Sequence, residues 1–445
     1  MTNDMTRGRI LPQLIGFTIP LVLGNLFQLT YNAADSVIVG KYVGEQALAA
    51  VGTSTPIMNI AILLISGMCM GASVLMSSQY GAKDYDTLSR QISTTMLAGC
   101  GFSVVFSLLM LLLANPVLRL IRVPETAIPE AAAYLRIIFM GLIFTFMYNF
   151  LANTMRALGD SKTPLYFLVT SAFLNIFGDL FFVVVLRWGV AGSAIATVCS
   201  EGLCCLLCGI YIKKKIPLLC LGKKWWVFDK SLLGKTVSYG STSAMQQVCL
   251  QLGKLIIQSV VNTQGVAVMA AFTAVNRVDD FAYTPQQNIG HAMTTFLAQN
   301  KGAGHKERMK KGFQTGLLIE LVYSIGLFCV IWGLAPQIMT LFAEDGDAQV
   351  VSLGISYLHL ISWMYILPGL TNGVQGFFRG IGDLKVTLYS TFMNMFGRVV
   401  AVFVMIRLLQ MEFASLAWAN MVGWIVMLLF EVPLLVKSMR NGECG

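Results

Sequence analysis

Two aspartates lie inside long apolar stretches of this sequence, where an ionised carboxylate is costly. Asp35 and Asp179 therefore each need a partner, a proton or a cation. Asn175 precedes Asp179 by four residues, which places both on one face of a helix. Carboxylate, amide and hydroxyl oxygens are the ligands that hard cations prefer, and two neighbouring carboxylates can also share a proton.

The helices expected to carry these residues bring them to a similar depth in a membrane. Counted from the expected start of its helix on the inner side, Asp35 lies about 30 Å along the helix and Asp179 about 22 Å. Thr197 lies on a helix that starts on the outer side, about 10 Å from that start, so all three reach a similar depth. We predict one ion site, for Na⁺ or H⁺, formed by Asp35, Asn175, Asp179 and Thr197. In the simpler alternative, Asn175 and Thr197 only join helices by hydrogen bonds and Asp35 sits at a wet helix end.

The second half of the chain lacks these acids, since Ile256 and Arg398 stand where Asp35 and Asp179 stand in the first half. Its polar residues gather instead on the seventh and eighth apolar stretches. They predict a wet, substrate-binding cavity, to which we assign Gln246, Asn276, Asp279, Asp280, Gln287 and Arg398. A cluster of Arg277 paired with the two aspartates, serving packing alone, is the alternative of equal weight. Glu320 and Glu431 are expected nearer helix ends.

The surrounding composition is that of a membrane protein. Hydrophobic residues make up 56% of the chain and charged residues 12%, about half the charge of a soluble domain. Apolar stretches long enough to cross a bilayer as helices recur throughout. We predict an all-α integral membrane protein with twelve transmembrane helices, at about 14–40, 52–78, 92–114, 132–156, 164–187, 190–212, 235–261, 270–298, 313–333, 350–378, 385–408 and 413–437.

The basic residues set the expected orientation. The net charge of +9 suggests nucleic-acid binding, but its distribution argues against that partner. Lysine and arginine crowd every second gap between the expected helices, 22 residues against five in the other gaps. By the positive-inside rule the crowded side is cytoplasmic, which puts both termini inside. A cell (inner) membrane location follows as an expectation.

The two halves of the chain repeat each other. Arg156–Asp160 (RALGD) returns as Arg379–Asp383 (RGIGD), and Asn175–Asp179 (NIFGD) returns as Asn394–Arg398 (NMFGR), at offsets of 223 and 219. Six spans per repeat give both halves one orientation, and transporters place substrate between such repeats. We predict two pseudo-symmetric six-helix lobes, at 1–212 and 236–445, joined by a cytoplasmic linker at 213–235.

An ordered set of motifs resembles the multidrug and toxic compound extrusion (MATE) family along essentially the whole chain. Its most specific members are Arg156–Pro164 and Arg379–Lys385. The others are Ile19-Pro20 with Asp35, Leu48–Gly52, Gln79–Ala82 with its second-half echo, and Gly192–Thr197.

The resemblance implies a V-shaped pair of lobes that export compounds against an inward flow of Na⁺ or H⁺. Members with an ion site in the first lobe use an aspartate, an asparagine–aspartate pair and a threonine, which correspond here to Asp35, Asn175, Asp179 and Thr197. Other members rely on acids of the seventh and tenth helices. This chain has no carboxylate there, which favours the first lobe.

The expected function is therefore cation-coupled antiport of amphipathic, mainly cationic, organic compounds by alternating access. A lipid-linked oligosaccharide flippase with related lobes is the alternative, although such clefts need many cationic groups. We expect no enzymatic activity and no cofactor beyond the coupling ion. The expected partners are a small-molecule substrate and the lipid bilayer, and the expected oligomeric state is a monomer.

Overall fold

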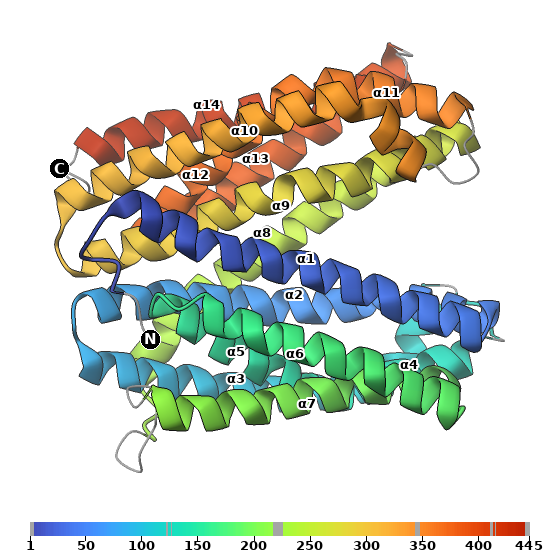
Figure 1. Cartoon of the computed structure of the whole chain (residues 1–445), viewed down its shortest axis with the longest axis horizontal. Helices are drawn as coiled ribbons and strands as arrows, with labels where there is room; N and C mark the ends of the chain where they lie inside the picture. Colours follow the sequence, from blue (N-terminus) through green and yellow to red (C-terminus); the bar gives the residue numbers. More distant parts are fainter. Residues whose placement is uncertain are drawn as a thin grey trace. The chain divides into compact units, whose positions relative to one another are not determined.

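The computed structural model describes residues 4–121, 123–125, 127–216, 226–342, 348–409, 413 and 415–440. All secondary structure within these ranges is helical, which confirms the predicted fold class (Figure 1). The α-helices are α1 (Ile10–Tyr42), α2 (Glu45–Gly81), α3 (Tyr85–Leu120), α4 (Ile128–Met140), α5 (Leu142–Ala157), α6 (Lys162–Asp179), α7 (Gly189–Lys215), α8 (Lys230–Val261), α9 (Val266–Gly302), α10 (Lys306–Phe342), α11 (Ala348–Ser362), α12 (Ile366–Ile381), α13 (Leu384–Phe403) and α14 (Ser415–Arg440).

The described chain forms two compact units. Unit 1 comprises residues 4 and 19–244, and unit 2 comprises residues 5–18 and 245–440. Helices α1 and α8 are therefore each divided between the units. The division of α1 falls beside Pro20, which lies inside the helix and removes one of its backbone hydrogen bonds. Part of the predicted linker, 217–225, lies outside the described residues, and the division of the chain into lobes at 213–235 stays a prediction.

Each of the twelve predicted ranges is helical in the structure, but not all of these helices are long and apolar enough to count as membrane spans. Within the described residues, nine helical segments pass by length and composition, or ten if α4 and α5, bent by 47° at their junction, form one. The helices that fail are α8, which contains several lysine, glutamine, serine and threonine residues, and α9, which contains asparagine, glutamine and aspartate. The count of twelve spans therefore stays a prediction.

The duplication is visible in the order of the elements. In the first half, α6 continues into a π-helix at Leu180–Val185, and in the second half α13 continues into one at Val404–Leu408. The break between α4 and α5 likewise has its counterpart between α11 and α12, at the 3₁₀ turn Trp363–Tyr365.

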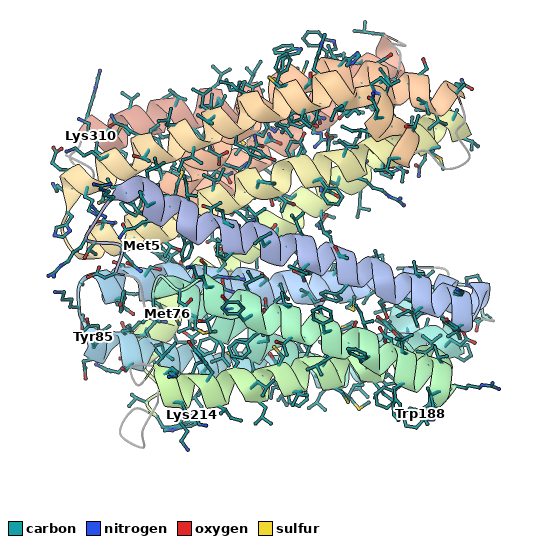
Figure 2. The ribbon with its side chains drawn as sticks, viewed as in Figure 1. Met5, Met76, Tyr85, Trp188, Lys214 and Lys310 are labelled. Carbon is teal, nitrogen blue, oxygen red and sulfur yellow. The ribbon has the colours of Figure 1, made fainter. Side chains whose placement is uncertain are left out.

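In unit 1, Trp188 and Lys214 lie at opposite ends of α7 (Figure 2).

Each unit has its own apolar core, and the outer faces of its helices also carry apolar side chains. Unit 1 packs around Phe139 and Phe150, and unit 2 around Tyr357 and Phe272. Large apolar side chains such as Leu112, which is 79% exposed, lie on the outside. Outward apolar side chains of this kind suit contact with lipid.

Glycines allow the closest helix packing in unit 2. A Cβ at Gly376 of α12 would lie only 2.7 Å from the carbonyl oxygen of Gly290 on α9, so the two backbones touch there. Small residues permit this approach, which drives helix association where no water is present. The contact matters for function because α9 carries Asn276, Asp279 and Asp280, three of the residues predicted to bind substrate.

Gly376→Ala is expected to destabilise unit 2, because a methyl group cannot fit between two backbones. Overpacking of this kind costs about 1–3 kcal/mol. Thermal unfolding of the purified protein in detergent measures the loss. Gly326→Ala on α10 is the control, because a Cβ there meets nothing within 4 Å. Equal melting temperatures for both variants would contradict the packing described.

Candidate functional site

The predicted ion site depends on the close approach of α6 and α7. Gly178 of α6 faces Ala196 of α7, and a Cβ on the glycine would lie 3.0 Å from the alanine Cβ. A larger residue at Gly178 would push the helices apart. This packing brings the polar face of α6, which carries Asn175 and Asp179, against the polar face of α7.

Direct contacts join the predicted residues into one cluster in unit 1. The Asn175 side chain donates a hydrogen bond from Nδ2 to Thr197 Oγ1 at 3.2 Å. The carboxyl groups of Asp35 on α1 and Asp179 on α6 lie within hydrogen-bonding reach of each other, a contact that needs a proton between them. Ser193 Oγ donates to Asp35 Oδ1 at 2.7 Å.

Burial leaves this cluster with more acceptors than donors. Asp179 is 0% exposed and Asn175 3%. Both oxygens of Asp179, and Oδ1 of Asn175, receive no hydrogen bond from a donor in the described part of the chain. Nor does any lysine or arginine among the described residues act on the two aspartates. Buried acceptors in such excess call for a proton or a cation, since a bare charge there is very costly.

Apolar side chains and tyrosines lie around the pair. Val39, Val51, Ile138, Val190 and Ala194 form a buried cluster, together with Tyr134 of α4. The tyrosine interacts electrostatically with both aspartates. A low-polarity wall strengthens the attraction between the carboxylates and any cation that they hold.

The structure thus places all four predicted ion-site residues together, and it adds Ser193, which the sequence analysis missed. Ser193 precedes Thr197 by four residues, so helical spacing alone could have found it. Tyr134 gives no such signal, because its helix is distant in sequence. That these residues bind an ion stays a prediction.

Ser193→Ala is expected to weaken the site without destroying it, because it removes the hydroxyl donor to Asp35. A hydrogen bond to a charged group contributes about 1.5–3 kcal/mol, so the half-saturating concentration of the coupling cation should rise about tenfold or more. Transport measured against cation concentration gives this value. Ser200→Ala is the matched control on the same helix, since the Ser200 hydroxyl donates to the Thr197 backbone carbonyl and to no carboxylate of the described residues. A response of Ser193→Ala equal to the control would contradict the assigned contact.

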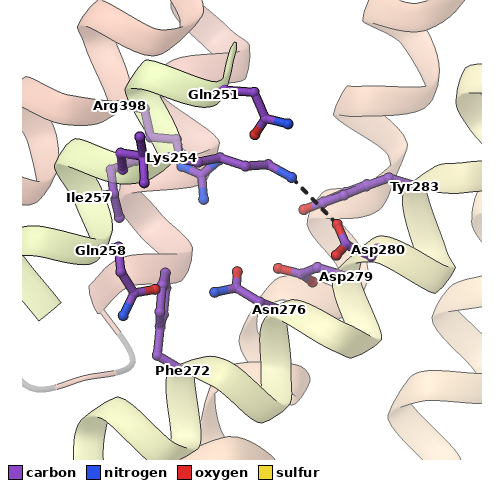
Figure 3. A pocket seen from close by; sticks show the side chains of 11 residues that line it. Gln251, Lys254, Ile257, Gln258, Phe272, Asn276, Asp279, Asp280, Tyr283 and Arg398 are labelled. Atoms are coloured by element: carbon purple, nitrogen blue, oxygen red, sulfur yellow. Dashed lines mark hydrogen bonds and ion pairs between the residues drawn. The ribbon is translucent and has the colours of Figure 1, made fainter. Parts of the chain in front are cut away.

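A second candidate site is a cavity of roughly 240 Å³ in unit 2, between α8, α9 and α13 (Figure 3). It combines acidic, basic, amide and aromatic groups with aliphatic ones. The lining residues are Gln251, Lys254, Leu255, Ile257, Gln258, Phe272, Asn276, Asp279, Asp280, Tyr283 and Arg398. Most of this lining comes from α8 and α9, the two helices that are too polar to be counted as membrane spans.

Asp279 is held rigidly at the wall of this cavity. It is 3% exposed. Tyr365 donates a short hydrogen bond to its Oδ1, and Tyr357 donates to its Oδ2 at 3.1 Å. Asn420 Nδ2 donates to the Tyr357 hydroxyl at 2.8 Å. Each carboxylate oxygen keeps a lone pair, so Asp279 can still accept from a ligand.

The basic side chains that face Asp279 and Asp280 are not Arg277, the partner considered in the sequence analysis. Lys254 Nζ lies 3.5 Å from Asp280 Oδ1 (Figure 3), and Arg398 interacts electrostatically with Asp279. Arg277 is exposed instead. Asp280 and Lys254 are both more than half exposed, so their ion pair contributes little stability.

Of the predicted substrate residues, Asn276, Asp279, Asp280 and Arg398 line the cavity, and Gln246 and Gln287 do not. Gln246 is buried and donates to Gln375 Oε1 at 3.2 Å and Thr391 Oγ1 at 2.9 Å. Gln287 is exposed, because it lies on another face of α9. For these two residues the cavity gives no support to a substrate contact.

The sequence analysis missed aromatic residues of this cavity. Tyr283 packs edge-on against Tyr365 and Trp424, at centroid distances of 5.5 and 5.9 Å. Its buried hydroxyl has no hydrogen-bond partner among the described residues. Tyr283 follows Asp279 by four residues, so helical spacing from the polar set was the available signal.

Together these features define a duplicated, multi-pass α-helical membrane protein with an acidic cluster in one repeat and a mixed-charge cavity in the other. The chain belongs to the MatE family, whose model matches it twice, at residues 20–181 and 243–404. The two matches are offset by 223 residues (243 − 20), in agreement with the repeats in the sequence.

Known proteins resemble the chain in sequence and in fold. A probable multidrug resistance protein, YpnP of Bacillus subtilis, is 32% identical over 86% of this chain and 86% of its own length. A solved outward-facing multidrug resistance MATE family transporter of the MOP superfamily superposes with a TM-score of 0.89 at 22% identity, covering 98% of this chain and 97% of its own. A MATE structure in the straight conformation gives 0.91 at 20% identity and 98% coverage of both chains.

Proposed function

We propose that this protein is a cation-coupled antiporter that exports amphipathic, mainly cationic, organic compounds across the cell membrane. Membership of the MatE family and the description of YpnP as a probable multidrug resistance protein support multidrug export. The site residues support the coupling. The cavity of unit 2 is lined by both aromatic rings and carboxylates, which supports a substrate that is hydrophobic and positively charged.

The observation that carries the coupling is the surplus of buried acceptors around Asp179. Two carboxylates and an amide oxygen face one another without a lysine, an arginine or a sufficient set of donors in the described chain. Oxygen ligands of this kind suit Na⁺ as well as a proton. A cluster built only for stability would not need two adjacent acids, because apolar residues of similar size pack there at lower cost.

The coupling acts through a difference in affinity between two conformations. A cation that binds the aspartate pair more tightly in one state shifts the population toward that state. If the same state binds the exported compound weakly, the compound is released as the cation enters. Helix α1 links the two events, because it carries Asp35 and contains Pro20 beside the point where the chain passes from unit 2 to unit 1.

A lipid-linked oligosaccharide flippase is less well supported. Its phosphate groups would need cations that are free to bind them. Lys254 and Arg398 line the cavity, but each faces an aspartate, Asp280 and Asp279 respectively. The cavity therefore has no marked excess of positive charge.

Efflux from reconstituted vesicles tests the proposal. Purified protein is placed in liposomes loaded with a cationic dye, and a Na⁺ gradient or a pH gradient is imposed separately. An inward gradient of the coupling cation is expected to accelerate dye export above the rate in protein-free vesicles. Equal export with and without either gradient would overturn the coupling, and no export of any cationic dye would overturn the substrate class.

A further inference from the structure

Glu320 is a buried carboxyl group that the proposed transport mechanism leaves unused. It lies about 21 Å along α10 from Lys306, well inside the helix rather than near its end. Its side chain is 0% exposed. Neither of its carboxyl oxygens has a hydrogen-bond partner among the described residues.

Polar atoms converge beside this carboxyl group. A Cβ at Gly369 of α12 would lie 2.9 Å from Ser324 Oγ, 3.3 Å from Gln286 Nε2 and 3.4 Å from Glu320 Oε2. The three groups come from α9 and α10 and surround one point. Only glycine fits there, because a Cβ would be crowded by all three polar atoms; we call this tightly packed group of Glu320, Ser324, Gln286 and Gly369 the polar chamber.

The donors in this chamber are already used. Gln286 Nε2 donates to Ser324 Oγ at 3.1 Å and to the Tyr365 carbonyl at 2.8 Å. Ser324 Oγ donates to the Glu320 backbone carbonyl at 2.7 Å. Gln286 Oε1 is buried and, like the Glu320 oxygens, receives no donor from the described chain. An ionised Glu320 would therefore add a negative charge to a site that already lacks donors, at high cost.

No charged side chain in the described ranges acts on Glu320. Tyr323, its neighbour on α10, donates its hydroxyl to the Ala282 carbonyl at 3.1 Å. Of the elements packed against α10, α9 brings Gln286 and α12 brings Gly369, which do not titrate, and η6 brings Tyr365, whose hydroxyl donates to Asp279. The remaining helix, α11, brings His359 against Trp332, which lies further along α10 than Glu320. Glu431 is also fully buried, and its carboxyl oxygens likewise have no hydrogen-bond partner among the described residues, but it differs from Glu320 because Arg379 acts on it electrostatically.

Tyr365 connects this chamber to the cavity of unit 2. Its carbonyl accepts the hydrogen bond from Gln286, and its hydroxyl donates to Asp279 at the cavity wall. Tyr365 lies in the 3₁₀ turn Trp363–Tyr365, which joins α11 to α12. A shift of Gln286 toward or away from Glu320 would therefore move a residue that holds Asp279.

We propose that Glu320 is a second proton-binding site, in unit 2, whose occupancy is transmitted to the Asp279 cavity through Gln286 and Tyr365. The proton comes from water and returns to it. When bound, it makes Glu320 a neutral acid and supplies the donor that the chamber lacks. When released, it leaves a carboxylate that attracts the Gln286 amide and loosens the Tyr365 contact.

Infrared difference spectroscopy tests proton binding without any transport, so a failure here is distinct from a failure of the proposed antiport. Purified protein in an Asp35→Asn/Asp179→Asn background is titrated in H₂O and D₂O. We expect a carbonyl band of a buried carboxylic acid that shifts in D₂O and is lost in Glu320→Gln. An unchanged spectrum in Glu320→Gln would overturn the proposal. Bleaching of the band by Na⁺ at constant pH would also overturn the proton assignment.

Gly369→Ala provides a second variant that keeps the carboxyl group. Its methyl group enters the chamber, so the frequency of the band and the midpoint of its titration should both move. Gly326→Ala, on an exposed face of α10, should leave both unchanged. Identical titrations of the two glycine variants would contradict a proton site at this point.

Transmission to the cavity has its own readout. The dissociation constant of a cationic dye, measured at equilibrium in the same background, should change about fivefold or more across the titration of the band. In Glu320→Gln, which imitates the protonated state, that dependence on pH should disappear. A dependence that survives in the variant would show that Glu320 does not act on the cavity.

Discussion

Replacing Asp35 by asparagine is expected to abolish cation-driven export while leaving the protein folded in the membrane. Asparagine keeps the size of the side chain and can still bond to Ser193, but it carries no charge and cannot share a proton with Asp179. Coupling free energies between sites are typically about 1–3 kcal/mol, so losing the coupling should lower total efflux about 5- to 150-fold, to the rate seen without a cation gradient. Efflux of a cationic dye under a fixed cation gradient measures the loss.

The control for this variant is an aspartate that lies outside the cluster. Asp86 is exposed in the first turn of α3, so Asp86→Asn should export at the wild-type rate. Size-exclusion chromatography in detergent shows whether both variants are folded. Export by Asp35→Asn at the rate of Asp86→Asn, under the same gradient, would remove the aspartate pair from the coupling mechanism.

Asp279→Asn is expected to weaken the binding of cationic compounds and to leave neutral ones nearly unchanged. The amide oxygen can still accept from one of the two tyrosines, and the amide nitrogen can donate to the hydroxyl of the other, so the wall of the cavity should persist. The main change is the loss of the negative charge, and an interaction with a charged group contributes about 1.5–3 kcal/mol. Affinity for a cationic dye should therefore fall about tenfold or more.

Paired ligands provide the measurement, since a cationic dye and a neutral analogue of similar size can be titrated against the same variant. Asp280→Asn is the matched comparison, because Asp280 is more exposed and its pair with Lys254 is screened by solvent. It should have the smaller effect on the cation. Equal losses for the cationic and the neutral ligand would reduce Asp279 to a packing role.

The sequence predicted the membrane class, the duplication and the first-half cluster because each depends on local or periodic features. Apolar stretches and basic gaps are read directly from the chain. The spacing of Asn175 from Asp179 fixes their common helix face. The meeting of Asp35 with Asp179 could be anticipated only because helix depth follows from residue count in a membrane of fixed thickness.

The unit 2 site was harder to predict, since its contacts join residues far apart in the chain. Asp279 is held by Tyr357 and Tyr365, which lie 78 and 86 residues away. Glu320 was expected near a helix end, because hydropathy alone does not show where a 37-residue helix such as α10 packs. Only the packing of α9, α10 and α12 reveals that this carboxyl group is fully buried.

The most direct test of the central claim is whether a substrate gradient alone can drive the coupling cation. Vesicles containing the purified protein are loaded with a cationic dye at equal Na⁺ concentration and equal pH on both sides, and the dye is then diluted outside. As dye leaves, Na⁺ or H⁺ indicators inside should report cation entry, and Asp35→Asn should abolish that entry. Dye export by the wild-type protein without any movement of either cation would contradict the account.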